Sequence, residues 1–242
     1  MRALAVAGRV LTQLRRDHRT LAMLLVLPCL LISLLWWMFE DLPGASFDRF
    51  GPGLLALFPF TVMFLVTSVT TLRERSSGTL ERLLSMPMGK LDFLLGYALA
   101  FGAIAAVQAA LAVGVSIGLL GLDVNGPAWL LGVVAIADAV LGTALGLFVS
   151  AFAATEFQAV QFMPLVVIPQ ILLCGLFVPR DAMPGVLEAI SNVLPLSYAL
   201  DAMQELVGAG DESEVWRNVA VVLGFALAGL ALGAATLRRR TT

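Results

Sequence analysis

The sequence predicts an all-α membrane protein with six transmembrane helices, organised as a single domain over residues 1–242. The chain is 60% hydrophobic and only 13% charged, and its mean hydropathy is +0.94, far above the balance of a soluble domain. Six apolar runs approach or exceed the length needed to cross a bilayer. Lys and Arg gather in alternate connections, as spans of alternating direction require.

An amphipathic helix is expected within residues 1–19. One helical face collects the apolar residues Leu4, Ala7, Leu11 and Leu14. Arginines recur every seven residues on the opposite face, at Arg2, Arg9 and Arg16. Such a helix is expected to lie in the headgroup plane and to attract anionic lipid, the alternative being a disordered basic tail.

Six spans account for the apolar runs, and they cover residues 21–38, 51–72, 93–120, 129–153, 158–178 and 215–237. The fifth contains Pro164 and Pro169, each of which removes a backbone hydrogen bond and leaves a carbonyl in need of a partner. We expect a mobile or cavity-lining helix there, the alternative being simple kinked packing. Small-residue spacings such as Gly142-xxx-Gly146 are expected to serve close packing within the bundle.

Residues 181–207, between the fifth and sixth spans, carry two short stretches with helical apolar spacing, separated by Pro195. Each stretch is too short to cross a bilayer. Because backbone groups at membrane depth must be bonded within a helix or buried in protein, we expect a pair of re-entrant helices in the outer leaflet. A solvated outer loop is the alternative.

The orientation follows from the distribution of basic residues. A cytoplasmic N-terminus places 12 of the 15 Lys and Arg residues inside and leaves only Arg49, Arg180 and Arg217 outside. The positive-inside rule therefore predicts that both termini, and the polar stretch between the second and third spans, face the cytoplasm.

That polar stretch, residues 73–92, interrupts an otherwise membrane-soluble sequence. As a helix it presents one apolar face, formed by Leu80, Leu83, Leu84 and Met88. Arg75, Thr79 and Arg82 fall on the opposite face, so the spacing predicts a short amphipathic helix held between two spans.

No motif of an enzyme is present. The sequence lacks a nucleophile elbow, a zinc-protease motif and paired carboxylates, and Gly89-Lys90 lacks the other residues of a P-loop. Cys29 and Cys174 lie in apolar runs without ligand-spaced neighbours, so we expect them to pack and expect no metal site. The chain is predicted to bind no cofactor, and any ATP-driven step needs a separate polypeptide.

Asp138 is the one acidic residue well inside a span, where a charged carboxylate is costly. It is expected to face the protein interior. A polar site in a substrate path or a proton-coupling carboxylate is one interpretation. A structural hydrogen bond to Gln108 or Gln161 is the other.

The chain resembles the ABC-2 type permease family, the membrane subunits of a class of ATP-binding-cassette exporters. The resemblance rests on ERSSGTLERLLSMP (74–87) with LGY (95–97), and on CGLFVPRDAMP (174–184) with LPLSYALDA (194–202). It covers nearly the whole chain, and it is greatest to the short permeases of the daunorubicin-exporter kind.

The resemblance implies a dimer, formed with a second copy or with a sister permease, in which each permease docks one ATPase subunit. ATP and Mg would then bind to the two ATPase subunits. It also implies a coupling helix after the second span, made of Glu74, Arg75, Gly78, Thr79, Leu80, Glu81, Arg82, Leu83, Leu84 and Pro87. The rival interpretation is that this apolar face floats on lipid.

The predicted function is the transmembrane subunit of an exporter in a bacterial plasma (inner) membrane. Its expected cargo is an amphipathic or lipophilic small molecule, such as a drug, an antibiotic or a lipid-like compound, and no nucleic acid. The candidate residues for the substrate path are Phe58, Phe60, Phe64, Gln108, Asp138, Phe162, Pro164 and Gln170. The same side chains would also suit ordinary packing.

Three alternatives stay open. The chain could be a self-sufficient secondary transporter that uses Asp138 as its ion-coupled group. It could export polysaccharide, lipid or ions within the same family. It could also be a membrane anchor that only recruits an ATPase.

Overall fold

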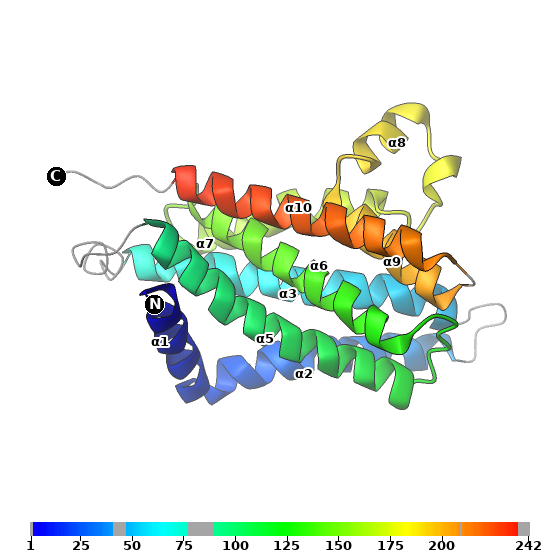
Figure 1. Cartoon of the computed structure of the whole chain (residues 1–242), viewed down its shortest axis with the longest axis horizontal. Coiled ribbons are helices and arrows are strands. Elements are labelled where there is room, and N and C mark those ends of the chain that lie inside the picture. Colours follow the sequence, from blue (N-terminus) through cyan, green and yellow to red (C-terminus); the bar gives the residue numbers. More distant parts are fainter. Residues whose placement is uncertain (1, 41–46, 77–89, 209, 237–242) are drawn as a thin grey trace.

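A computed structural model describes residues 2–40, 47–76, 90–208 and 210–236, and its regular elements within these ranges are all helical (Figure 1). The all-α prediction is confirmed. Six helices are long and apolar enough to cross a membrane, and they are α2 (His18–Phe39), α3 (Phe47–Ser76), α5 (Lys90–Gly118), α6 (Ala128–Ser150), α7 (Glu156–Leu173) and α10 (Glu212–Thr236). The shorter elements are α1 (Arg2–Arg16), η1 (Arg180–Ala182), α8 (Gly185–Ser191) and α9 (Pro195–Val207).

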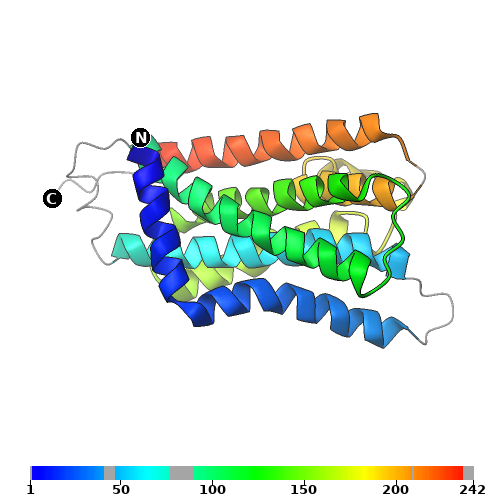
Figure 2. The ribbon, with the colours of Figure 1, turned by 60° about the horizontal axis from the view of Figure 1, so that its bottom comes forward.

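The six long helices run side by side along the long axis of the molecule, and α1 lies across one end of them (Figure 2). The last turns of α3 and α10 and the first turns of α5 lie at this end. Helices α8 and α9 belong to the opposite end, where α9 packs on the bundle and α8 stands away from it (Figure 1). The two ends are therefore built from different short helices.

Helix α6 is the centre of the bundle. Its apolar stretch is 72% buried, against 17% for α2 and for α7, because α3, α5 and α10 all pack on it. Two glycines allow α3 to approach closely. A Cβ atom on Gly142 would lie 2.4 Å from the Phe60 carbonyl oxygen, and one on Gly146 would lie 2.5 Å from that of Phe64. The Gly142-xxx-Gly146 spacing thus serves packing within the bundle.

Helix boundaries follow local chemistry. Asp17 separates α1 from α2, because its carboxylate accepts a hydrogen bond from the Thr20 backbone N–H at 3.1 Å and caps α2. The Thr155 hydroxyl caps α7 in the same way. Helix α7 ends at Leu173, before the end of the predicted span 158–178, and Gly175 follows with a φ of +104° that favours glycine.

The N-terminal helix exists as predicted, but its buried face differs. Val6, Ala7, Val10 and Leu14 are buried, whereas Leu4 and Leu11 are exposed. The physical reason is that α1 rests on the start of α5, so part of its apolar surface is covered by protein. Leu4 and Leu11 remain available to lipid.

Two short helices occur within residues 181–207, as predicted, and they differ in burial. Helix α9 buries one face against α10, α3 and α6, with Leu196, Leu200 and Met203 almost fully covered. Helix α8 leaves Val186 and Ile190 exposed. Whether this pair enters a membrane stays a prediction.

Candidate functional site

The predicted coupling helix falls mostly outside the described residues. The positions concerned are Gly78, Thr79, Leu80, Glu81, Arg82, Leu83, Leu84 and Pro87. The other two, Glu74 and Arg75, lie in the last turns of α3, which continues to Ser76. The structure therefore shows the two stems of this segment, the end of α3 and the start of α5, and its coupling role stays a prediction.

Glu74 connects the α3 stem to α1. Its carboxylate accepts a hydrogen bond from Arg9 Nη2 at 2.9 Å, and its side chain is only 9% exposed, against 36% for Arg9. The sequence predicts Arg9 on the polar face of α1, among lipid headgroups. It turns inward because a buried carboxylate needs a cationic or hydrogen-bonding partner.

Helix α1 packs without a gap on the α5 stem. A Cβ atom on Gly96 would lie 2.6 Å from Val6 Cβ and 2.9 Å from the Ala3 carbonyl oxygen, so only glycine fits there. The next residue, Tyr97, is fully buried. Its side chain interacts with both Glu74 and Arg9. Three helices thus meet in one cluster formed by Arg9, Glu74 and Tyr97.

The residue before Glu74 connects α3 to a different helix. Arg73 Nε and Nη2 each donate to one carboxylate oxygen of Glu156 at 3.0 Å, at the start of α7. This pair is largely exposed, so it contributes less to stability than a buried pair. Two consecutive charged residues therefore link the end of α3 to α1 and to α7.

The aromatic candidates for a substrate path differ in exposure. Phe60 and Phe64 are fully buried, with ring centroids 6.5 Å apart, and lie where α3 packs against α6. Phe58 and Phe162 are half-buried, and Pro164 is exposed. In this conformation Phe60 and Phe64 fill the interior, and a role for any of these residues in transport stays a prediction.

Gln108 has a structural partner. Its Nε2 donates to the Leu24 carbonyl oxygen of α2 at 2.9 Å. This carbonyl lies four residues before Pro28, whose ring nitrogen has no hydrogen to donate to it. Gln108 therefore satisfies the backbone group that the proline leaves open.

Gln170 also bonds to backbone. Its Nε2 donates to the Val166 carbonyl oxygen at 3.2 Å, and its Oε1 accepts from the Leu196 N–H, in the first turn of α9, at 3.3 Å. Beside it, the Ser191 hydroxyl donates to the Leu173 carbonyl oxygen at 2.6 Å and lies 3.2 Å from the Ser197 hydroxyl. This network ties α8 and α9 to the end of α7.

Asp138 lies in the middle of α6 and is fully buried. Within the described residues, neither of its carboxylate oxygens has a hydrogen-bond partner. Gln108 donates to Leu24 instead, and Gln161 is exposed. Of the two interpretations of Asp138, the structure does not form the hydrogen bond to Gln108 or Gln161, and the carboxyl group has unmet bonding capacity.

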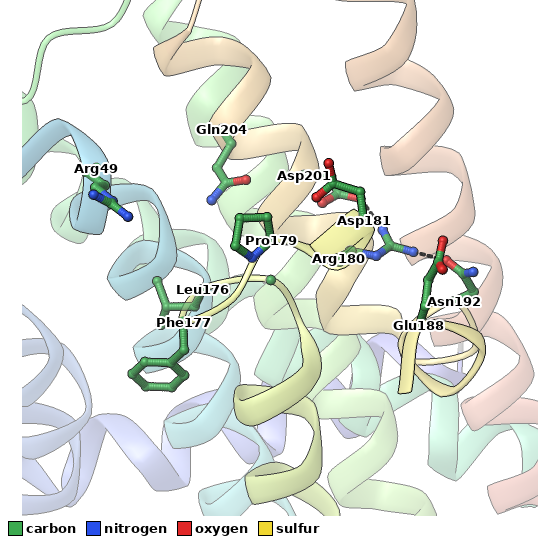
Figure 3. A pocket seen from close by; sticks show the side chains of 11 residues that line it. Arg49, Leu176, Phe177, Pro179, Arg180, Asp181, Glu188, Asn192, Asp201 and Gln204 are labelled. Atoms are coloured by element: carbon green, nitrogen blue, oxygen red, sulfur yellow. Dashed lines mark hydrogen bonds and ion pairs between the residues drawn. The ribbon is translucent and has the colours of Figure 1, made fainter. Parts of the chain in front are cut away.

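A cavity of about 490 Å³ opens at the other end of the bundle, beside α8 and α9 (Figure 3). Arg180 lines this cavity and bonds to the carboxylate of Asp201 and to the side-chain oxygen of Asn192. Its guanidinium carbon lies 5.4 Å from the centroid of the Tyr198 ring. The lining residues are Arg49, Gly175, Leu176, Phe177, Pro179, Arg180, Asp181, Glu188, Asn192, Asp201 and Gln204.

Sequence reasoning missed this cluster. The available signal was the presence of Arg180 and Asp201 in two short segments that are otherwise largely apolar. Burial raises the pKa of the Asp201 carboxyl, and the nearby Arg180 opposes that rise. Among the described residues, no group of three or more His, Cys, Asp or Glu side chains is arranged to hold a metal ion.

Several known proteins are similar to this chain in sequence. The chain is 27% identical over 173 residues to "Probable multidrug ABC transporter permease YbhS" of Escherichia coli (strain K12), covering 71% of this chain and 44% of that protein. It is 29% identical over 209 residues to "Inner membrane transport permease YhhJ" of the same strain, covering 80% and 54%. It is 26% identical over 186 residues to "Linearmycin resistance permease protein LnrN" of Bacillus subtilis (strain 168), covering 74% and 48%.

The chain thus spans about half the length of these curated relatives. All three are named as permeases, in agreement with the prediction of a membrane permease rather than an enzyme. A sequence model of the family described as "ABC-2 type transporter" matches residues 2–207, most of the chain. The protein belongs to the ABC-2 type transporter family.

Proposed function

We propose that this chain is the transmembrane part of an ATP-driven exporter that moves an amphipathic or lipophilic small molecule outward across a bacterial plasma membrane. The observation that carries the proposal is the family match over residues 2–207 of a six-helix bundle. A separate ATPase subunit binds ATP and Mg and supplies the energy. The names of two relatives, a multidrug permease and a linearmycin resistance permease, support a lipophilic cargo such as a drug or antibiotic.

The proposed orientation places the α1 end of the bundle in the cytoplasm. Among the side chains that the structure describes, the basic ones at this end are Arg9, Arg15, Arg16, Arg19 and Arg73, against Arg49, Arg180 and Arg217 at the α9 end. Acidic side chains gather at the α9 end, and they include Asp123, Asp181, Glu188, Asp201, Glu205 and Glu212. This asymmetry supports cytoplasmic termini and a cytoplasmic segment 77–89.

The proposed transporter contains two permeases and two ATPase subunits. Helices α2 and α7 are the least buried spans, so each leaves a broad apolar surface for a second permease copy, a sister permease or lipid to cover. The segment between α3 and α5 docks the ATPase subunit, inserting Leu80, Leu83 and Leu84 into an apolar groove of that partner.

The Leu83→Asp variant tests this docking. The permease and its ATPase subunit are reconstituted together, and vanadate-sensitive ATP hydrolysis and the size-exclusion profile are measured. We expect the complex to dissociate and the hydrolysis rate to fall, because a charge replaces a side chain inserted into an apolar groove. Ser85→Asp is the matched control, since helical spacing places Ser85 off the apolar face. An unchanged rate with an intact complex would contradict the proposal.

Asp138 favours a second candidate function, a self-sufficient ion-coupled transporter. The supporting observation is a fully buried carboxyl group that has no hydrogen-bond partner among the described residues. Proton-gradient-driven uptake of a lipophilic dye into liposomes that contain this chain alone would favour it, provided that Asp138→Asn abolishes the uptake. Uptake that requires the ATPase subunit and survives Asp138→Asn would favour the exporter.

A further inference from the structure

We propose that Arg9 and Glu74 are positioning residues for ATP-driven transport: their ion pair fixes α1 across α3 and α5, so that both stems of segment 77–89 move as one body. The inference rests on the proposed exporter function. It assigns a mechanical role to α1, the helix expected only to lie among lipid headgroups.

The first step is the contact between α1 and the α5 stem. Val6, Ala7 and Val10 are buried against α5, in a cluster that includes Tyr97 and Phe101. At Gly96 the two helices are too close for any side chain. Because packed interiors leave no free space, α1 and the start of α5 can be displaced only together.

The second step is the contact between α1 and the α3 stem. Helix α1 packs mainly on α5 and to a lesser extent on α2. Toward α3, α1 shares an apolar cluster that includes Met63, and the Arg9–Glu74 pair, at 2.9 Å, adds a direct ionic bond to the last turns of α3. Close packing therefore holds α1 on the start of α5, and the ion pair is what bonds it to the last turns of α3.

The third step concerns the strength of this ionic connection. Glu74 is 9% exposed, and Tyr97 of α5 interacts with both members of the pair. Removing Arg9 would leave the Glu74 carboxylate largely desolvated and without its main counter-charge, which is more costly than breaking an exposed pair. A displacement of segment 77–89 by the ATPase subunit would consequently move α1, α3 and α5 together.

The test uses the complete transporter, with its ATPase subunit, in proteoliposomes. Transport of a lipophilic dye and ATP hydrolysis are measured together for Arg9→Gln and Glu74→Gln. We expect dye moved per ATP hydrolysed to fall about fivefold or more, the low end of typical coupling between sites. Hydrolysis itself continues, because segment 77–89 still docks. The control is Arg15→Gln, an exposed arginine on the same helix, which should keep the wild-type ratio.

The charge swap Arg9→Glu with Glu74→Arg separates pairing from mere stability, since it restores the ion pair and should recover much of the ratio. Thermal unfolding of each variant is recorded, and Arg9→Gln alone carries the test if Glu74→Gln does not fold, because Arg9 is the more exposed partner. A wild-type ratio in Arg9→Gln, or a swap no better than the single variants, would overturn the pairing. Failure of the proposed function would look different, since the wild-type transporter itself would then move no dye with ATP.

Discussion

The two ends of the bundle attach their short helices by different means. At one end, α1 is held by apolar packing on α5, with the Arg9–Glu74 pair as a direct ionic bond to α3. At the other end, Gln170 and Ser191 hold α8 and α9 through hydrogen bonds to backbone groups at helix ends. The first attachment contains an ion pair between two side chains, whereas the second satisfies backbone groups at helix ends in a partly buried network.

This difference predicts that a volume change will harm the α1 end most. Gly96→Leu should destabilise the protein by about 3 kcal/mol, the upper part of the range for overpacking, because its Cβ would overlap Val6 and the Ala3 carbonyl. Thermal unfolding in detergent measures the loss, and amide hydrogen exchange over residues 2–16 reports the release of α1.

The control for that prediction is Gly114→Leu on the same helix, where a new Cβ has no neighbour within 4 Å. It should leave the unfolding temperature and the exchange of α1 unchanged. Equal losses of stability in the two variants would mean that α5 is sensitive to any added volume. The close contact at Gly96 would then not explain the effect of Gly96→Leu.

The opposite end should respond most to the loss of a hydrogen bond. Ser191→Ala leaves the Leu173 carbonyl without its donor, which should cost about 1–3 kcal/mol in a buried site. Ser33→Ala is the matched control, because the Ser33 hydroxyl bonds to a carbonyl one turn earlier within its own helix. Its unfolding temperature should barely change, and a similar fall in both variants would argue against the network.

Sequence reasoning predicted the six spans and the short helices because both depend on hydropathy and length alone. It placed Arg9 on the polar, headgroup-facing side of α1, since periodicity describes one helix and contains no information about the buried Glu74 beside it. For the same reason it could not decide whether Gln108 lines a substrate path or serves packing. The sequence shows that Pro28 leaves the Leu24 carbonyl without its helical donor. It does not show that Gln108 of α5 supplies the replacement.

The outer cluster escaped prediction for a related reason. Asn192 and Asp201 lie 12 and 21 residues after Arg180 in the sequence, and the three meet only because α8 and α9 fold back onto the end of α7. Charge counting recorded Arg180 only as one of three outer basic residues. Tertiary contacts bring Arg180, Asn192 and Asp201 into one site, and the only local sign of it was a charged residue in each of two largely apolar segments.

The smallest predicted effect concerns the pH dependence of that outer site. Burial raises the pKa of Asp201 above its model-compound value of 3.8, although Arg180 opposes the rise. Between 3.8 and the higher folded-state pKa, the folded protein binds more protons than the unfolded chain, so stability falls as the pH rises through this window. Asp201→Asn removes the titrating group and should flatten that part of the profile.

The expected difference is about 1 kcal/mol or less, because the Arg180–Asp201 pair is partly exposed. Unfolding temperatures of wild type and Asp201→Asn, measured from pH 3.5 to 6, would give the two slopes. Asp181→Asn, which changes an exposed carboxylate on the same cavity, should keep the wild-type slope. Parallel profiles for wild type and Asp201→Asn would mean that Arg180 fully offsets the effect of burial on Asp201. The stability of the outer site would then rest on an ion pair, as it does for Arg9 and Glu74, rather than on hydrogen bonds to the backbone.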